Sequence, residues 1–393
     1  MIGVIADDLT GAAELGGIGL RHGLKAEVIL QGECIGDTDL LCVDTDTRSC
    51  TAKEAAWRAA AAARRLRKAG AAWIYKKVDS VLRGNVLAEV GAIREALGLR
   101  SALLVPANPR FGRVIRDGRY FVKGKLIHQT DFAQNPEYPR RSPDVLKMLK
   151  VTKAGKMSVT RLSNYRPTSG IVLGEVSSSA DVQKWASQRS EDMLLAGGAE
   201  FFEAVLQAME LNLVAADVSR LQSLCFPKLE KSSARGRELF ICGSTSDYTL
   251  QFVNQAQRDG TPVFSMIDSG NKGISLGPAM LEAKAQEAII AFETHSRVVL
   301  AVGRPLIRRP IVARRLAQYL VKIAVRVLER AEVNRVYAEG GATAAEFVRQ
   351  LGWSRLKVLQ ELAPGVTTLA LADRHAPVLT IKPGSYPGWP LSR

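Results

Sequence analysis

Two adjacent carboxylates, Asp7 and Asp8, follow an apolar run at the start of the chain, where the carboxyl end of a buried strand is expected. Residues 75–85 form a second segment of this kind, in which lysine, aspartate, serine, arginine and asparagine side chains leave a strand in quick succession. Residues 44–48 form a third, Asp-Thr-Asp-Thr-Arg. In open α/β sheets such strand ends converge, and ligands bind there. Cations suit the carboxylate of a small polyhydroxy acid, and carboxylates accept hydrogen bonds from its hydroxyls.

Alternation along the second segment places Lys77 and Asp79 on the same face of a strand, where their charges are expected to pair. The competing interpretation of this segment is a surface salt-bridge cluster, which contributes little to stability. Asp8 also has a purely structural interpretation, as the N-cap of the helix that begins near Ala12. Thr10 could serve as that N-cap instead. Because three polar strand ends occur together, a shared binding site is the favoured interpretation.

Glycine-rich and hydroxyl-rich turns follow three strand-like segments in the second half of the chain, at residues 240–246, 336–344 and 379–384. Glycines beside helix N-termini let backbone N–H groups approach phosphate oxygens closely. Each turn alone is weak evidence, because Gly-Gly turns are common helix entries. The chain has no GxxxxGK[ST] segment and no GxGxxG after the first strand, which excludes a P-loop and the dinucleotide-binding fingerprint.

Apolar periodicity predicts an α/β chain with two domains, and 393 residues with 47% hydrophobic content can fill two cores. In the first two hundred residues strands alternate with helices, which is typical of parallel sheets with right-handed crossovers. The expected strands are Gly3–Ala6, Ala26–Leu30, Leu40–Asp44, Trp73–Lys77, Ser101–Pro106 and Gly170–Val176. The expected helices are Gly11–His22, Lys53–Ala69, Val86–Leu97, Val182–Gln188 and a last one from Ala199 to Met209.

Two stretches interrupt this alternation. Residues 107–143 have glycines and prolines throughout and are predicted to be a long irregular loop, a type of segment that is usually functional in a compact domain. Residues 221–237 are rich in serine, lysine and arginine and are predicted to link an N-terminal domain, 1–225, to a C-terminal domain, 235–393. The expected strands of the second domain are Glu238–Cys242, Pro262–Met266, Ser296–Ala301, Arg335–Ala338 and Val378–Lys382. Its expected helices are Thr249–Arg258, Leu276–Glu293, Ile311–Arg330 and Thr343–Gln350.

The formal net charge of +15 indicates anionic ligands or nucleic acid. Much of it lies in residues 304–330, where apolar residues recur at helical spacing, so most of this charge is predicted to be the solvated face of an amphipathic helix. Stacking aromatics are almost absent there, and no nucleic-acid partner is expected.

Five scattered cysteines and four scattered histidines predict free thiols and no zinc site. No apolar run approaches the roughly 20 residues that cross a bilayer, and we expect a cytoplasmic protein with no membrane partner.

The chain resembles the four-carbon acid sugar kinase family over nearly its whole length. The most specific motifs are Ala6-Asp-Asp-Leu-Thr-Gly-Ala12 and Lys77-Val-Asp-Ser-Val-Leu-Arg-Gly-Asn85, supported by residues 106–113, 243–246, 340–341 and 364–366. The resemblance implies two three-layer α/β domains whose mostly parallel sheets face each other across a cleft. It implies a sugar acid such as threonate, erythronate or an oxo-tetronate on the N-terminal domain, and ATP on the C-terminal domain. The implied reaction is phosphoryl transfer to a terminal hydroxyl, with Mg²⁺ bridging the phosphates.

The resemblance extends to individual residues. The predicted sugar-acid contacts are Asp8, Arg48, Lys77, Val78, Asp79 and Ser80, together with Arg83 of the same segment. The predicted nucleotide contacts are Ser244, Gly340, Gly341, Ala342, Thr343 and Gly384. Of these, Lys77 and Arg48 suit the substrate carboxylate, and Asp8 or Asp79 suits the base that orients the attacking hydroxyl. No residue is assigned to a metal.

Two positions depart from the family pattern, both on the nucleotide side. Ala342 stands where Asp or Glu usually follows the Gly-Gly turn, and Pro387 ends a turn that usually reads Lys-x-Gly-x-Phe-Gly. Glu339, just before the Gly-Gly turn, is the candidate to compensate. The departures motivate an alternative function, a sugar-acid-binding or regulatory protein with impaired phosphoryl transfer. The sequence leaves the oligomeric state open, and a homodimer through an exposed patch is compatible with it.

Overall fold

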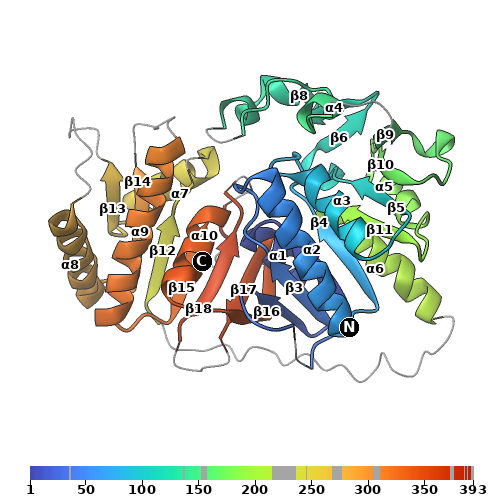
Figure 1. Ribbon diagram of the computed structural model, residues 1–393. Helices are drawn as coiled ribbons and strands as arrows, with labels where there is room; N and C mark the ends of the chain where they lie inside the picture. The colour runs from blue at the N-terminus through green and yellow to red at the C-terminus, as the bar shows by residue number, and fades with distance from the viewer. Residues whose placement is uncertain are drawn as a thin grey trace. The chain divides into compact units, whose positions relative to one another are not determined.

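A computed structural model describes residues 1–34, 37–135, 138–151, 157–214, 236–244, 246–267, 277–303, 310–371, 376–384, 386 and 388–390 (Figure 1). The chain divides into two compact units. Unit 1 comprises residues 1–29 and 33–225, and unit 2 comprises residues 30–32 and 226–393. The predicted interdomain linker lies largely outside the described residues.

Unit 1 is built on a parallel sheet of eight strands among the described residues. In spatial order these are β2 (Ala26–Ile29), β3 (Leu40–Asp44), β1 (Ile2–Ala6), β4 (Trp73–Lys77), β11 (Met193–Gly197), β5 (Ser101–Val105), β10 (Gly170–Gly174) and β9 (Met157–Thr160). The central strands are buried along nearly their whole length, which is why they appear in the sequence as continuous apolar runs. The six strands expected in this half of the chain are confirmed, and β9 and β11 were not predicted.

Helices cover both faces of this sheet, as right-handed crossovers require. Their bounds are α1 (Leu9–Arg21), α2 (Ala52–Lys68), α3 (Val86–Ala96), α5 (Ser179–Ala186) and α6 (Ala199–Val214). Helices α2 and α3 pack against each other, and α6 packs against α1 and α5 (Figure 1). The buried side of α2 is nearly all alanine, so its axis can approach α3 closely.

The expectation of an irregular loop over residues 107–143 is wrong. The segment folds into a three-stranded antiparallel sheet, β6 (Arg113–Arg116), β7 (Arg119–Val122) and β8 (Lys125–Leu126). Both connections have two residues with positive φ, 51° and 67° at Asp117 and Gly118 and 48° and 80° at Lys123 and Gly124. That is the signature of tight hairpin turns, and an Asp-Gly pair between strands is a hairpin signal that the sequence contained. Short helical turns complete the segment: η1 (Pro109–Phe111), η2 (Ile127–Gln129), η3 (Asp131–Gln134) and, just beyond it, α4 (Val145–Met148).

Unit 2 has its own mostly parallel sheet. In spatial order its strands are β13 (Val263–Ile267), β14 (Arg297–Gly303), β12 (Glu238–Cys242), β15 (Arg335–Glu339), β18 (Val378–Lys382), β17 (Val366–Ala370) and β16 (Arg355–Ala363). Its helices are α7 (Asp247–Arg258), α8 (Pro278–Thr294), α9 (Pro310–Arg330) and α10 (Gly341–Gln350). The five predicted strands and four predicted helices are confirmed. The hairpin β16–β17 is antiparallel and was not predicted, although Pro364-Gly365 marks its turn.

Helix α9 carries the basic segment of the sequence. Its described apolar residues face the core, including Leu316, Leu320 and Ile323, while Arg315 and Lys322 are exposed. The expectation of a solvated charged face is therefore confirmed for the described part of this helix.

Within the described residues, no helix combines the length and the apolar character that a membrane span requires. The four described cysteines are free thiols, as expected, and the fifth lies outside those residues.

Candidate functional site

The three polar strand ends of unit 1 come together, as the sequence predicts. Strand β1 lies between β3 and β4, with Ala6 in register with Asp44 on one side and Lys77 on the other. Val78 is buried, and its N–H donates to the carbonyl of Gly197 (2.9 Å). The side chains that follow these strands form one charged group, here termed the strand-end cluster: Asp7, Asp8, Arg48, Asp79 and Arg83.

Arg48 is the centre of the strand-end cluster. Its Nε and Nη2 donate to the two oxygens of Asp7, each at 2.8 Å, and its Nη1 donates to Oδ2 of Asp8 at 2.5 Å. Its Nη2 also lies 4.0 Å from a carboxylate oxygen of Asp79. Burial disfavours the charged form of Asp7, yet the charges of Arg48 and Lys76 hold the pKa of Asp7 below its usual value. Asp7 is therefore an ionised partner that fixes the guanidinium plane.

Asp8 is both a helix cap and a member of the charged cluster. Its Oδ1 accepts the N–H of Gly11 at the start of α1 (2.9 Å), and its Oδ2 accepts the hydroxyl of Thr10 (2.6 Å). A Cβ added at Gly11 would meet Oδ1 of Asp8 at 2.9 Å and Nζ of Lys77 at 3.3 Å. The small residue thus leaves room for a carboxylate and an ammonium group at the same helix start.

Asp79 is held by the turn that it begins. Arg83 donates to it through Nε (2.9 Å) and Nη2 (2.7 Å), and the backbone N–H groups of Val81 and Arg83 add bonds of 3.2 and 3.0 Å. Burial disfavours the carboxylate, but the charges of Arg83 and Arg48 hold the pKa of Asp79 well below its usual range. Asp79 is therefore permanently ionised at neutral pH, with most of its lone pairs occupied.

The predicted pairing of Lys77 with Asp79 is wrong. Nζ of Lys77 lies 3.3 Å from a carboxylate oxygen of Glu14 on α1. Lys76, on the opposite face of β4, forms an ion pair with Glu89 on α3. Both glutamates are buried, and neither was a candidate, because each lies inside a helix where a charge usually faces solvent. The helices on the two faces of the sheet thus neutralise the two lysines separately.

The backbone around the strand-end cluster contains two unusual residues. Asp46 (φ 46°) and Leu82 (φ 63°) lie in the left-handed region, which is rare for side chains other than glycine. Gly84 (φ 83°) follows, and a Cβ there would lie 3.2 Å from Oδ2 of Asp7 and 3.4 Å from Cγ of Arg48. Such strain concentrates at functional sites, where the surrounding contacts maintain it.

Asp44, at the end of β3, is a buried carboxyl whose pKa is shifted in the opposite direction to that of Asp79. Its Oδ1 accepts the N–H of Asp46 (2.8 Å). Burial, together with the charges of Asp46, Asp8 and Asp7, raises the pKa of Asp44 well above its usual range. Without an arginine of its own, this carboxyl resists ionisation.

The hairpin segment after β5 also reaches the site. Ser80 receives a hydrogen bond from the guanidinium of Arg113, and its carbonyl receives one from the hydroxyl of Tyr120. The hydroxyl of Tyr138 donates to the carbonyl of Arg48. Sequence reasoning expected a functional loop here and noted residues 106–113, which end at Arg113, as a family motif. It assigned none of these three side chains to the site, because their approach depends on tertiary folding.

The nucleotide-side turns of unit 2 meet at the carboxyl edge of its sheet. A Cβ added at Gly384 would overlap Oγ of Ser244, and one at Gly243 would overlap Oγ1 of Thr343. Gly340 (φ 96°) would place a Cβ 3.9 Å from the backbone N of Ser244. The structure therefore brings these predicted residues together, and their close backbone approach explains the glycines.

Helix α10 begins at Gly341, and Ala342 is exposed in its first turn. Pro387 lies outside the described residues. Glu339, proposed to compensate for Ala342, forms a buried ion pair with Nζ of Lys382 (2.5 Å), and its Oε2 has no hydrogen-bond partner. The N–H groups in the first turn of α10 have no partner within the helix, and such groups suit a phosphate.

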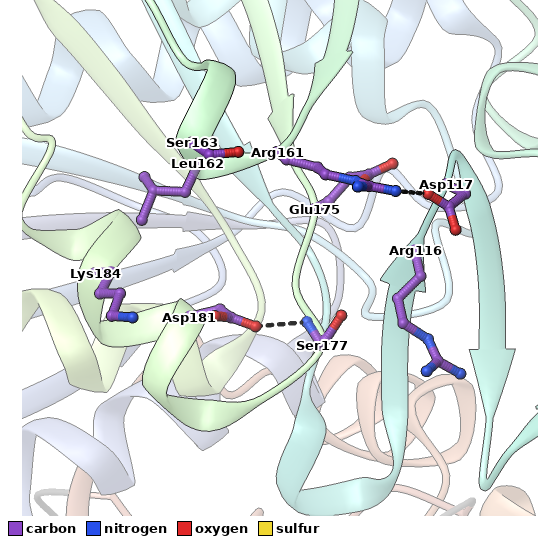
Figure 2. Close-up of a pocket in the computed structure, with 9 residues that line it drawn as sticks. All are labelled: Arg116, Asp117, Arg161, Leu162, Ser163, Glu175, Ser177, Asp181 and Lys184. Atoms are coloured by element: carbon purple, nitrogen blue, oxygen red, sulfur yellow. Dashed lines mark hydrogen bonds and ion pairs between the residues drawn. The ribbon is translucent and has the colours of Figure 1, made fainter.

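A separate cavity of about 520 Å³ lies in unit 1 beside the β6–β7 turn and the start of α5. Figure 2 shows its charged side chains, with Arg161 reaching toward Asp117 and Asp181 toward Ser177. Asp181 also completes the capping box of α5. Because its carboxylates pair with Arg161 or cap a helix, and because it shares no residue with the strand-end cluster, it is not the candidate site.

Comparison with known proteins matches both halves of the chain. Residues 2–205 match the family described as a sugar-binding N-terminal domain, and residues 239–386 match the nucleotide-binding C-terminal domain. The chain belongs to the four-carbon acid sugar kinase family. The strand-end cluster thus lies in the sugar-binding domain of this family, and the glycine turns lie in its nucleotide-binding domain.

Curated relatives within the family are named as kinases. A D-threonate kinase of Salmonella typhimurium is 24% identical, covering 92% of this chain and 89% of its own. A D-erythronate kinase of Heliobacterium modesticaldum is 27% identical, covering 92% and 88%. A 3-oxo-tetronate kinase of Pseudomonas fluorescens is 24% identical, covering 99% and 94%.

Two solved structures share the fold. One, from Salmonella typhimurium and described as a suspected tRNA synthase, has a TM-score of 0.73 at 21% identity, covering 98% of this chain and 96% of its own. The other, from Haemophilus influenzae, has a TM-score of 0.67 at 19% identity, covering 98% and 97%. At such identities the likeness establishes the α/β fold alone.

Proposed function

We propose that this protein transfers the γ-phosphoryl group of ATP to the terminal hydroxyl of a four-carbon sugar acid. The observation that carries the proposal is the strand-end cluster, three carboxylates and two arginines gathered at one sheet edge of the sugar-binding domain. A polyhydroxy acid is the class of ligand that such a mixed set recognises, since it offers both hydroxyl donors and an anionic group. The names of the full-length relatives support the same chemistry.

Asp8 is the proposed base that orients the attacking hydroxyl. Oδ2 of Asp79 already accepts three hydrogen bonds, and its Oδ1 accepts one from Arg83. Oδ1 of Asp8 accepts one bond from the protein in the described structure and retains a lone pair for a substrate hydroxyl. The side chain of Asp8 is also the more exposed, at 12% against 7% for Asp79. Asp79 then acts by fixing Arg83 and the strained turn.

The reaction in this proposal is a single displacement. The substrate oxygen forms a bond to the γ-phosphorus, and the bond from that phosphorus to the β–γ bridging oxygen breaks, leaving its electron pair on ADP. The hydroxyl proton passes to the carboxylate of Asp8. Positioning and electrostatic stabilisation supply most of the acceleration in reactions of this class.

On the nucleotide side, the first turn of α10 and the Ser244 turn are proposed to hold the phosphates of ATP through backbone N–H groups. Mg²⁺ would neutralise phosphate charge there. No group of three or more metal-ligating side chains occurs among the described residues. Glu339 is the nearest fit, since its Oε2 is unpartnered, but its ion pair with Lys382 opposes a second cation. The ion is therefore proposed to be held chiefly by the phosphates and water, as Mg²⁺ often is.

The alternative, a sugar-acid-binding protein with impaired phosphoryl transfer, is motivated by the exposed Ala342. Coupled ADP release with Mg-ATP and a panel of four- and five-carbon sugar acids separates the two functions. Turnover with one member supports the kinase and identifies its substrate. Tight binding of a sugar acid without ADP release supports the alternative, and Ala342→Asp should then tighten Mg-ATP binding, because it restores a carboxylate beside the phosphates.

A further inference from the structure

The cations of the strand-end cluster are already engaged by protein carboxylates. The Nε and Nη2 groups of Arg48 both donate to Asp7, and the same two groups of Arg83 both donate to Asp79. Lys77 lies against Glu14. A sugar acid that bound its carboxylate to any of these would have to compete with a buried partner. If Arg48 and Lys77 bound the substrate carboxylate, as the sequence suggests, that carboxylate would share each cation with a carboxylate of the protein.

A third arginine in unit 1 has the same fork without a partner. Arg140, in the segment between η3 and α4, is 8% exposed, and its Nε and Nη2 are buried without a hydrogen-bond partner. Its backbone N–H donates to the carbonyl of Phe132 (2.9 Å), and this bond fixes the backbone from which the side chain extends. A planar fork of two N–H groups is the geometry that matches the two oxygens of a carboxylate.

The surroundings of Arg140 place it at the strand-end cluster. The charges acting on its guanidinium include those of Asp79 and Arg83. Two contacts of the same segment support this placement. Tyr138, two residues before Arg140, donates to the carbonyl of Arg48. Phe132, whose carbonyl accepts the N–H of Arg140, has its ring centroid 5.5 Å from the guanidinium carbon of Arg113, which donates to Ser80.

Such an arginine is costly for the ligand-free protein. Burying a charged group without a hydrogen-bonded counter-ion opposes folding, and burial indeed lowers the pKa of Arg140. The charge of Asp79 offsets part of this cost, but its oxygens are hydrogen-bonded to Arg83, and neither Nε nor Nη2 of Arg140 has a hydrogen-bond partner. An anionic ligand would supply the missing partner.

We propose that Arg140 binds the carboxylate of the sugar acid through its Nε–Nη2 fork and so selects acids over neutral polyols. This inference rests on the proposed function. In a four-carbon acid the carboxylate and the terminal hydroxyl lie at opposite ends of the chain, so the group that binds the first is distinct from Asp8, which receives the proton of the second. The segment between η3 and α4 then contributes specificity to a site whose base, Asp8, follows β1.

The experiment compares Arg140→Gln with Arg141→Gln, a matched control at the next residue, which is exposed. Kinetics with the sugar acid that wild type phosphorylates should show a KM raised about 10- to 100-fold in Arg140→Gln, as expected for a lost charged hydrogen bond. Its kcat should change far less, and Arg141→Gln should match wild type. Calorimetry without nucleotide should give the same loss of sugar-acid affinity. Affinity for the polyol of the same carbon number, which lacks the carboxylate, should not change.

Ligand-free thermal unfolding gives a readout independent of turnover. Arg140→Gln should unfold at the same temperature as wild type or higher, because an unpaired buried charge is removed; a clearly lower midpoint would show a structural role and overturn the inference. A fall in kcat at unchanged sugar-acid affinity would assign Arg140 to the phosphoryl group and overturn it too. If wild type turns over a sugar acid while Arg140→Gln keeps its KM, only this inference fails. If wild type neither binds nor phosphorylates any sugar acid, the proposed function fails with it.

Discussion

Replacing Asp8 with asparagine separates its chemical role from its structural ones. Asparagine is as good an N-cap as aspartate, so the bond from the N–H of Gly11 (2.9 Å) survives in Asp8→Asn. The change removes the negative charge and the proton acceptor. Arg48 loses one of its partners but keeps both bonds to Asp7, which maintain the plane of its guanidinium.

The expected magnitudes differ enough to be resolved. Losing one charged hydrogen bond to Arg48 should lower the free energy of unfolding by about 1–2 kcal/mol. Losing a positioned base should lower kcat by about 10²- to 10⁴-fold. That range corresponds to roughly 3–5 kcal/mol of activation free energy, which exceeds the stability effect.

The assay is steady-state ADP release at saturating sugar acid, together with urea unfolding and calorimetric titration of Mg-ATP. Asp8→Asn should lose turnover, remain folded and bind nucleotide as wild type does, because its contacts lie in unit 1. Thr10→Val serves as a control, because it removes the hydrogen bond from Thr10 to Oδ2 of Asp8 and keeps the charge of that carboxylate. A kcat within a few-fold of wild type would refute the assignment of the base, and loss of nucleotide affinity would contradict the division of labour between the domains.

Three further predictions concern the edges of the two sheets. Asp79→Asn should lower the free energy of unfolding at pH 7 by about 1–3 kcal/mol, because the partly buried Arg83 loses its counter-ion and its charged hydrogen bonds. In urea titrations this deficit should shrink below about pH 4, since a carboxylate with a lowered pKa stabilises the fold only while ionised. Asp44→Asn should do the opposite and stabilise the protein at pH 7, with a gain that vanishes toward pH 4, because its raised pKa makes ionisation unfavourable in the fold; a loss at pH 7 would contradict this. Gly243→Ala should weaken nucleotide binding at least about tenfold in calorimetry, because its Cβ would overlap Thr343 and displace the turn, whereas Gly277→Ala, which meets no atom within 4 Å, should not; equal affinities in the two variants would count against the nucleotide site.

The sequence predicts most of the parallel sheets, because buried parallel strands have continuous apolar runs and their helices have clear periodicity. It also predicts the meeting of the three polar strand ends, since carboxyl ends of adjacent parallel strands share one edge. The antiparallel hairpins were missed. Strands β6, β7 and β8 are short, and the Asp117-Gly118 turn that identifies one of their hairpins lies in a segment whose glycines and prolines resemble an irregular loop.

The pairing of charges within the site could not be predicted in the same way. Alternation along an extended strand would place Lys77 and Asp79 on one face, but β4 ends at Lys77. Glu14 approaches Lys77 from α1, and Arg83 contacts Asp79 through a turn that contains Leu82 at positive φ. Both partners depend on how helices and turns pack over the strand end, which strand periodicity does not encode. Residue types and spacing therefore predicted that the three polar strand ends meet, while tertiary packing decided which of their charges pair.

Direct identification of the product tests the central claim. We would incubate the protein with Mg-ATP and each four-carbon sugar acid, with Asp8→Asn as the control, and examine the mixture by ³¹P NMR coupled to ¹H. The account predicts a phosphomonoester whose phosphorus couples to the two protons of the terminal carbon, formed in step with ADP and absent from the control. Release of ADP with inorganic phosphate alone, or no reaction with any acid that the protein binds, would contradict it.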